Sequence, residues 1–203
     1  MSGVTLEEAL ARRRSCRSYD GQPVPAAVLD NVLAAALRGP SAGNTWALDL
    51  VVLDTPDAVA GYWDVTLPPR RRESFPWPGL LRAPVLILPV VDADAYVRRY
   101  GEPDKAHAGL GEAADDWPVP YWWVDSGAAI MSMLLAATAA GLGSLLFGVF
   151  GHEDDVRRHL AVPDDRRIVG AVALGWADTA QRPSLSAGRR RPSVDEITHR
   201  GRW

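Results

Sequence analysis

The chain has 203 residues, of which 47% are hydrophobic and 23% are charged. These values exclude an intrinsically disordered chain and a polytopic membrane protein, and the length suits one domain with a substantial core. The formal net charge of −3 argues against a general nucleic-acid binder, which normally carries a basic excess over a whole face. Because Cys16 is the single cysteine and no secretory leader opens the chain, we expect a cytoplasmic protein.

Two helices are predicted near the start of the chain. Thr5 and Glu8 form a capping-box pattern, which predicts a short helix that runs into the arginines at 12–14. Pro25 begins a second predicted helix with a continuous apolar stripe, and Gly39 with the following proline ends it.

The rest of the chain mixes predicted strands and helices. A buried central helix is predicted at 121–140, where Asp125, Ser126 and Ser132 argue against a membrane span. The segment at 92–120 is polar and rich in glycine and proline, which indicates an irregular lid or excursion. Elsewhere we expect strands at 47–53, 84–91, within 141–150 and at 168–176, and short helices from Pro56 and around 156–160.

This order of elements predicts an α+β fold. Helices and strands follow one another without regular βα alternation, which favours a sheet with helices packed on it over a doubly wound parallel sheet. We expect a single domain over 1–203, whose last part, at about 177–203, is a polar and arginine-rich tail.

Several common kinds of site are excluded by their context. The sequence GPSAG at 39–43 matches the nucleophile elbow of hydrolases, with Ser41 as nucleophile. An elbow needs a strand before the serine and a helix after it, whereas the predicted order here is the reverse. The four histidines are scattered without the spacing of a metal site, so no metal is predicted. No P-loop or dinucleotide-binding glycine motif follows a strand.

Arginines form two groups, at 12–17 and at 188–192. Each group alone is typical of a solvated charged surface. Guanidinium forks are natural partners of a phosphate, so the two groups would form a local anion site if they met in space.

Five short motifs also occur in a characteristic order. They are Arg14-Ser15-Cys16-Arg17, Pro40-Ser41 with Asn44, Asp125 at the start of the central helix, GLGS at 141–144 and Arg190-Arg191-Pro192. Over essentially its whole length the chain thereby resembles the nitroreductase family of FMN-dependent flavoproteins. It departs from the family pattern at Trp46 and Ala47, where glutamine and proline are usual, and GVFGHEDDV is about one residue longer than its counterpart.

The resemblance implies a mixed or antiparallel sheet flanked by helices, and a tight homodimer with FMN at the interface. The phosphate and the flavin edge would be bound by Arg13, Arg14, Ser15 and Arg17, joined by Arg189, Arg190 and Arg191. The partner subunit would contribute Pro40, Ser41, Ala42 and Asn44 against the ring. Main-chain groups of Phe147, Gly148 and Val149 would lie near the reactive N5 edge.

The expected activity is that of an FMN-dependent oxidoreductase. It would take hydride from NAD(P)H and pass it to a small planar acceptor, such as a nitroaromatic or a quinone, by a ping-pong mechanism. No catalytic acid–base pair is expected, and the candidates for stacking on the acceptor, or else for core packing, are Trp46, Trp117, Tyr121, Trp122 and Trp123. Two alternatives stay open: a flavin-sequestering protein whose 92–120 segment covers the ring, and a deazaflavin-linked or other flavin reductase.

Overall fold

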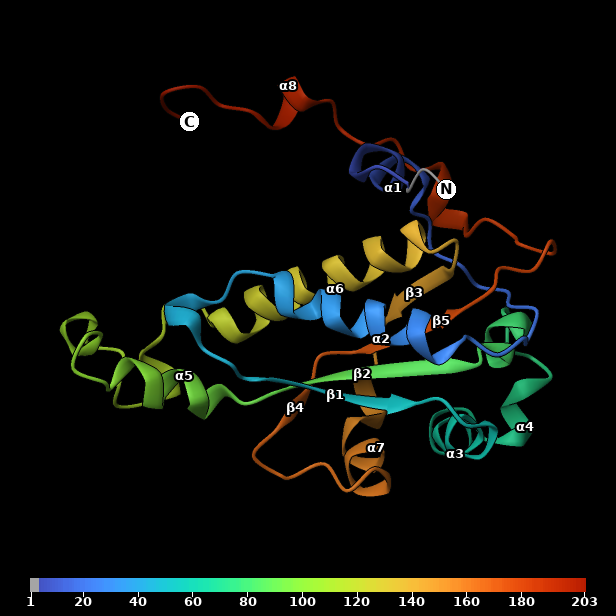
Figure 1. Cartoon of the computed structure of the whole chain (residues 1–203), viewed down its shortest axis with the longest axis horizontal. Helices are drawn as coiled ribbons and strands as arrows, with labels where there is room; N and C mark the ends of the chain where they lie inside the picture. Colours follow the sequence, from blue (N-terminus) through green and yellow to red (C-terminus); the bar gives the residue numbers. More distant parts are fainter. Residues whose placement is uncertain (1–3) are drawn as a thin grey trace.

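The computed structural model describes residues 4–203 and has an antiparallel sheet at its centre (Figure 1). Four strands lie in the order β1-β2-β5-β3, and a short β4 also pairs with β2. Every pairing is antiparallel, so the predicted α+β class is confirmed. The strands are β1 (Leu48–Leu53), β2 (Val85–Val91), β3 (Gly143–Phe147), β4 (Arg167–Ile168) and β5 (Ala171–Gly175).

Helices cover both faces of this sheet. Figure 1 shows α2 and α6 on one side and α3 and α7 on the other. The helices are α1 (Leu6–Arg12), α2 (Ala26–Ala35), α3 (Pro56–Thr66), α4 (Pro69–Arg72), α5 (Ala93–Tyr100), α6 (Tyr121–Ala139), α7 (Glu153–His159) and α8 (Val194–Ile197).

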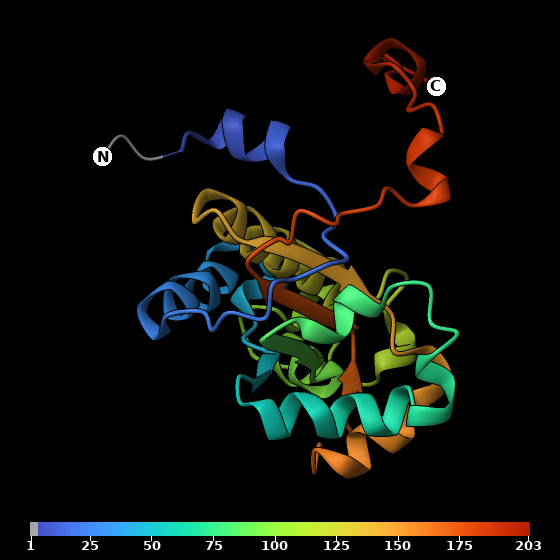
Figure 2. The same ribbon diagram turned by 90° about the vertical axis from the view of Figure 1, so that its right-hand side faces the viewer.

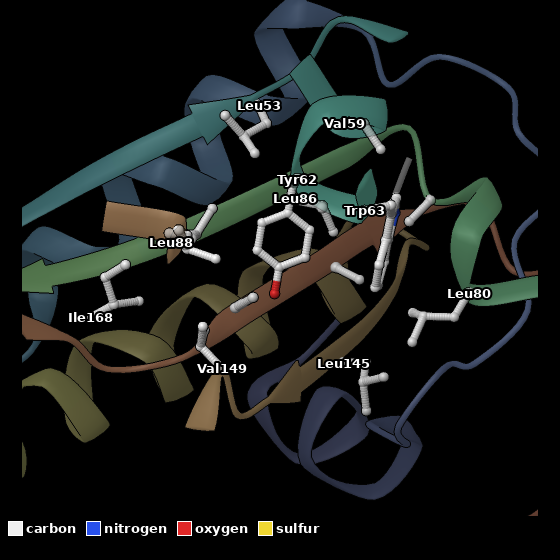
Figure 3. Close-up of a cluster of buried hydrophobic side chains, with 14 of the residues drawn as sticks. Leu53, Val59, Tyr62, Trp63, Leu80, Leu86, Leu88, Leu145, Val149 and Ile168 are labelled. Atoms are coloured by element: carbon white, nitrogen blue, oxygen red, sulfur yellow. The ribbon is translucent and has the colours of Figure 1, made fainter. Parts of the chain in front are cut away.

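Strand β2 divides the core into two layers. All of its residues are buried, as predicted for a strand covered on both faces. Ile87 faces the layer beneath α2 and α6, which contains Met133. Leu86 and Leu88 face the opposite layer, which Figure 3 shows with Tyr62 and Trp63 of α3 between the sheet and that helix. Successive side chains of β2 therefore point alternately to the layer of α2 and α6 and to the layer of α3.

The predicted helix starts and stops are confirmed near the N-terminus. In the capping box of α1, Glu8 N donates to Thr5 Oγ1 at 3.2 Å, and Thr5 N donates to Glu8 Oε2 at 2.9 Å. Helix α2 continues as a 3₁₀ turn and ends at Gly39. A Cβ atom on Gly39 would lie 3.2 Å from Ala129 N of α6, so this glycine allows close packing between the two helices.

The central helix α6 is buried along one face only. Met133 and Ala137 are fully covered, whereas Tyr121, Val124 and Met131 on the other side are 43%, 52% and 38% exposed. No helix within residues 4–203 is long and apolar enough to cross a bilayer.

Two regions differ from the sequence predictions. The segment at 92–120, expected to be irregular, contains α5. The strand expected at 168–176 is divided into β4 and β5, and Gly170 lies between them, where a Cβ atom would be 2.8 Å from Phe147 O. From residue 185 onward every side chain is exposed, and Figures 1 and 2 show this tail leaving the body of the molecule.

Candidate functional site

Residues 13–19, which we call the arginine segment, run alongside the start of β3 and the beginning of the tail. Cys16 N donates to Ser144 O at 2.9 Å, and Tyr19 forms an isolated bridge with Ala177. The side chains of Cys16 and Tyr19 are buried and anchor the segment in the core. The fold thus brings the arginine–serine motif against the GLGS motif, although they lie far apart in sequence.

The guanidinium groups of this segment are not neutralised within residues 4–203. No carboxylate there forms an ion pair with Arg13, Arg14 or Arg17. Arg14 donates instead to two main-chain carbonyls at the end of α1, and Arg17 lies 5.2 Å from the ring centroid of Trp77. Ser15 is exposed beside them. This set of donors is able to receive a phosphate.

The arginines of the tail are arranged differently. Arg190 forms a two-bonded ion pair with Glu196, with distances of 2.8 and 2.5 Å, while Arg189 and Arg191 are exposed. Figure 2 shows the tail and α1 leaving the same end of the body and then diverging. Within one chain the tail arginines therefore do not lie beside the arginine segment. Their predicted role, to bind the FMN phosphate together with that segment, stays a prediction.

The loop at 40–44, which we call the serine loop, is fastened to the start of α6. Ala42 N donates to Asp125 Oδ2 at 2.7 Å. Gly43 and Asn44 follow with left-handed backbone angles, φ 65° and 56°. Pro40 and Asn44 are exposed and Ser41 is half-buried, so the loop presents a small polar surface. The serine motif and the aspartate motif are thus joined directly.

The structure gives no support to a nucleophile at Ser41 or at the single cysteine, Cys16. Ser41 follows a helical turn and precedes β1, which is the reverse of a nucleophile elbow. Burial raises the pKa of the Cys16 thiol, which disfavours the reactive thiolate. No cluster of three metal-ligating side chains occurs in the part of the chain that the structure describes.

The serine loop and the arginine segment lie at opposite ends of α6 (Figure 1). The loop is bonded to Asp125 in the first turns of the helix, whereas the arginine segment contacts Ser144, which follows the helix end. At a rise of about 1.5 Å per residue, roughly 20 Å of helix separates Asp125 from Ala139. The two elements of one chain therefore cannot face each other across one flat ligand.

A sharp turn follows β3 at the expected N5 edge. The ring of Phe147 stacks on Trp63 in the core, with centroids 5.8 Å apart, and the side chain of Val149 is buried. At these two positions only main-chain groups can meet a ligand, and Gly148 between them is exposed. Sequence reasoning missed Phe150, which has a left-handed φ of 43° and an 89% exposed side chain that lies over Gly148.

The five aromatic candidates for stacking on an acceptor fall into two groups. Trp117 and Trp122 are buried in a cluster with Tyr96, so core packing accounts for them. Trp46 is 67% exposed, and Tyr121 and Trp123 are also exposed. Only these three can meet a ligand.

Comparison with known proteins identifies the fold and its chemistry. The sequence pattern described as the Nitroreductase family matches residues 10–176. The chain belongs to the nitroreductase family. The resemblance inferred from the motifs is thereby confirmed, and membership makes the protein an NAD(P)H-dependent oxidoreductase of a family that uses FMN.

Individual relatives cover nearly the whole chain. A 4-nitrobenzoate reductase of Nocardioides sp. (strain LMS-CY) is 33% identical over 222 residues, covering 96% of this chain and 90% of that protein. A putative NADH dehydrogenase/NAD(P)H nitroreductase of Methanothermobacter thermautotrophicus is 26% identical over 208 residues, covering 100% and 90%. The crystal structure of an FMN-dependent nitroreductase from Clostridium difficile R20291 has the same fold, with a TM-score of 0.66, 20% identity and coverage of 96% and 98%.

Proposed function

We propose that this nitroreductase-family chain works as a cytoplasmic homodimer that binds FMN between its subunits and reduces a small planar acceptor, such as a nitroaromatic or a quinone. The dimer is inferred from one observation: the serine loop and the arginine segment of one chain are separated along α6. In a two-fold dimer the serine loop of one subunit can lie opposite the arginine segment of the other.

The residues of the candidate site fit FMN chemically. The positive charges of Arg13, Arg14 and Arg17 are not neutralised by any carboxylate of residues 4–203. They are therefore available to a phosphate monoester, which is an anion. Strand β3 leads from Ser144, beside these arginines, to the exposed main chain of Gly148, about 13 Å away at 3.3 Å per residue. We infer that the phosphate lies at the first end and the N5 edge at the second.

Exposed apolar side chains on two helices support the proposal that a second copy of the chain binds there. Tyr121, Val124 and Met131 lie uncovered on α6, and Leu6 and Leu10 of α1 are 67% and 51% exposed. Exposed apolar side chains on helices that pack together, as α1 and α6 do, favour a contact surface. The tail adds exposed Val194, Ile197 and Trp203, and we propose that it reaches the partner subunit with Arg189–Arg191 near the shared site.

The protein's own part in the reaction is binding and exclusion. When bound, FMN would supply hydride transfer from NAD(P)H to the acceptor in two half-reactions, which is a ping-pong sequence. The arginines would bind the phosphate, the serine loop would support the ring, and Gly148 would offer its main chain beside the ring of Phe150. Trp46 and Trp123 are exposed aromatic side chains available to a planar acceptor.

The visible spectrum of the purified protein tests this proposal. The chain should be yellow, should elute as a dimer, and should bleach when NADH or NADPH is added without oxygen. A colourless chain that cannot be reconstituted with FMN would overturn it.

The alternatives differ in the bleaching step. A flavin-sequestering protein would be yellow but would bleach slowly or not at all with either nicotinamide. A deazaflavin-linked reductase would respond to that reductant in place of NAD(P)H. A panel of reductants and acceptors therefore separates the three.

A further inference from the structure

Helix α5, in the segment expected to be an irregular lid, packs against the serine loop. It starts after Asp92, whose side chain accepts a hydrogen bond from Ala95 N at 3.1 Å. Asp92 is buried and also pairs with Arg98 at 2.7 Å and with Arg166 at 3.0 Å. The base of the helix is therefore fixed to the body of the protein, close to strands β2 and β4.

Three side chains of α5 reach the serine loop or its anchor. Arg99 Nε donates to Gly43 O at 2.8 Å. The ring of Tyr100 lies against Gly43, where a Cβ atom would be 2.9 Å from it. Tyr96 OH donates at 2.8 Å to the same oxygen of Asp125 that accepts from the loop. The loop is therefore fixed from α6 on one side and from α5 on the other.

The guanidinium of Arg99 is itself oriented by two carboxylates. Asp104 accepts from its two terminal nitrogens at 2.7 and 2.8 Å, and Glu102 accepts from one of them at 2.9 Å. This leaves Nε directed at the loop carbonyl. A planar fork can satisfy both directions at once, whereas a lysine ammonium cannot form the two-bonded pair with Asp104 in addition.

The loop conformation needs such support. Gly43 and Asn44 both have left-handed backbone angles, a region that glycine adopts freely and that asparagine visits only occasionally. The loop's own bonds are few: Asn44 N donates to Ser41 O at 3.0 Å, and Thr45 N and Oγ1 donate to Ala42 O at 3.2 and 2.6 Å. The bond from Arg99 to Gly43 O therefore adds to the anchor at Asp125 and holds the part of the loop that Asp125 does not reach.

We propose that Arg99 is a positioning residue for flavin binding: by fixing the carbonyl of Gly43 from α5, it keeps Ser41 and Asn44 in the arrangement that receives FMN. This inference rests on the proposed function. It gives the 92–120 segment the role of a support for the loop, in place of a cover over the ring.

FMN titration of the full-length apoprotein, followed by flavin fluorescence, tests the role. R99M should weaken FMN binding about ten-fold, the effect expected for loss of one charge-assisted hydrogen bond. R99K should recover part of the affinity, and D104N should weaken binding less than R99M. R158M is the matched control, since Arg158 forms an ion pair with Asp155 on α7, and it should bind FMN as the wild type does.

Hydrogen exchange of the apoprotein provides a second readout that needs no flavin. Amides of residues 41–45 should exchange faster in R99M than in the wild type and in R158M, while amides of β2 keep their protection. Wild-type protein that binds no FMN would overturn the proposed function. Wild-type protein that binds FMN, together with R99M that binds it within two-fold as tightly, would overturn the role of Arg99 alone. Unchanged exchange in R99M would also overturn it.

Discussion

The carboxylate of Asp125 accepts a hydrogen bond from the main-chain N–H of Ala42 at 2.7 Å. This bond joins the central helix to the serine loop, and Tyr96 OH donates to the same oxygen at 2.8 Å. Burial and the neighbouring carboxylate raise the pKa of Tyr96, so its hydroxyl remains a proton donor across the physiological range. One acceptor therefore fixes two donors from separate elements.

We expect D125A to destabilise the protein by about 1–3 kcal/mol, because both donors lose their partner in a partly buried position. FMN binding should weaken with it, because the serine loop loses its anchor. Urea unfolding and FMN titration measure the two effects. D115A, at an exposed carboxylate with no hydrogen-bond partner in residues 4–203, is the control, and an equal loss in both variants would contradict the role of Asp125.

A second prediction concerns FMN binding by the arginine segment. Replacing both Arg14 and Arg17 with alanine should weaken FMN retention at least about ten-fold, since charge-assisted hydrogen bonds contribute about 1.5–3 kcal/mol each. The double variant R70A/R71A removes the same charge from exposed positions on α4 and should retain FMN normally. Equal losses in the two double variants would show that the motif is misassigned.

Strong local patterns made most of the fold predictable. The capping box of α1, the apolar stripe of α2 and the fully apolar run of β2 each specify their element without help from distant residues. Helix α5 was missed because it has only eight residues and stands at the start of a segment that is otherwise polar and rich in glycine and proline. Its contacts, such as those of Asp92 with Arg166 and of Arg99 with Gly43, are between segments far apart in sequence, so no local pattern reports them.

The candidate site was predictable to the extent that motifs mark it. The arginine–serine and serine-loop motifs could be located, but the sequence could not show that Arg190 pairs with Glu196. Arg99 acts on a main-chain carbonyl, and any residue supplies a carbonyl, so no motif marks that contact. Phe150 had one signal, namely the glycines on both sides of its turn, but its left-handed backbone follows only from the structure.

A third prediction concerns the backbone strain in the turn after β3. Phe150 has a φ of 43° and an 89% exposed side chain, so its backbone is strained while its ring contributes little burial. F150G should therefore be more stable than F150A by about 1 kcal/mol, because glycine adopts left-handed angles without the Cβ penalty. Urea unfolding of the two variants measures the difference. An F150A variant at least as stable as F150G would show that the backbone carries no strain there.

The contact between α7 and β4 should make the stability of the protein depend on pH. Glu153 accepts hydrogen bonds from two nitrogens of Arg167, at 2.8 and 3.0 Å, and from Ile168 N at 3.0 Å. These partners, Arg167 first, hold the pKa of the Glu153 carboxyl below its usual value of 4.5. A carboxyl with a lowered pKa in the folded state stabilises it above the unfolded-state pKa, and the stabilisation is lost as the pH falls through the lowered value.

The free energy of unfolding of wild type should accordingly exceed that of E153Q by about 1–3 kcal/mol at pH 7. This difference should stay constant down to about pH 5 and shrink below 4.5, as the carboxyl becomes protonated in the unfolded and then in the folded state. Urea unfolding of both proteins across this range measures it. E112Q, at an exposed glutamate outside any ion pair in residues 4–203, should match the wild type at every pH. If the E153Q difference were as large at pH 3 as at pH 7, the charge of Glu153 would not be its source, and side-chain shape or packing would account for it instead.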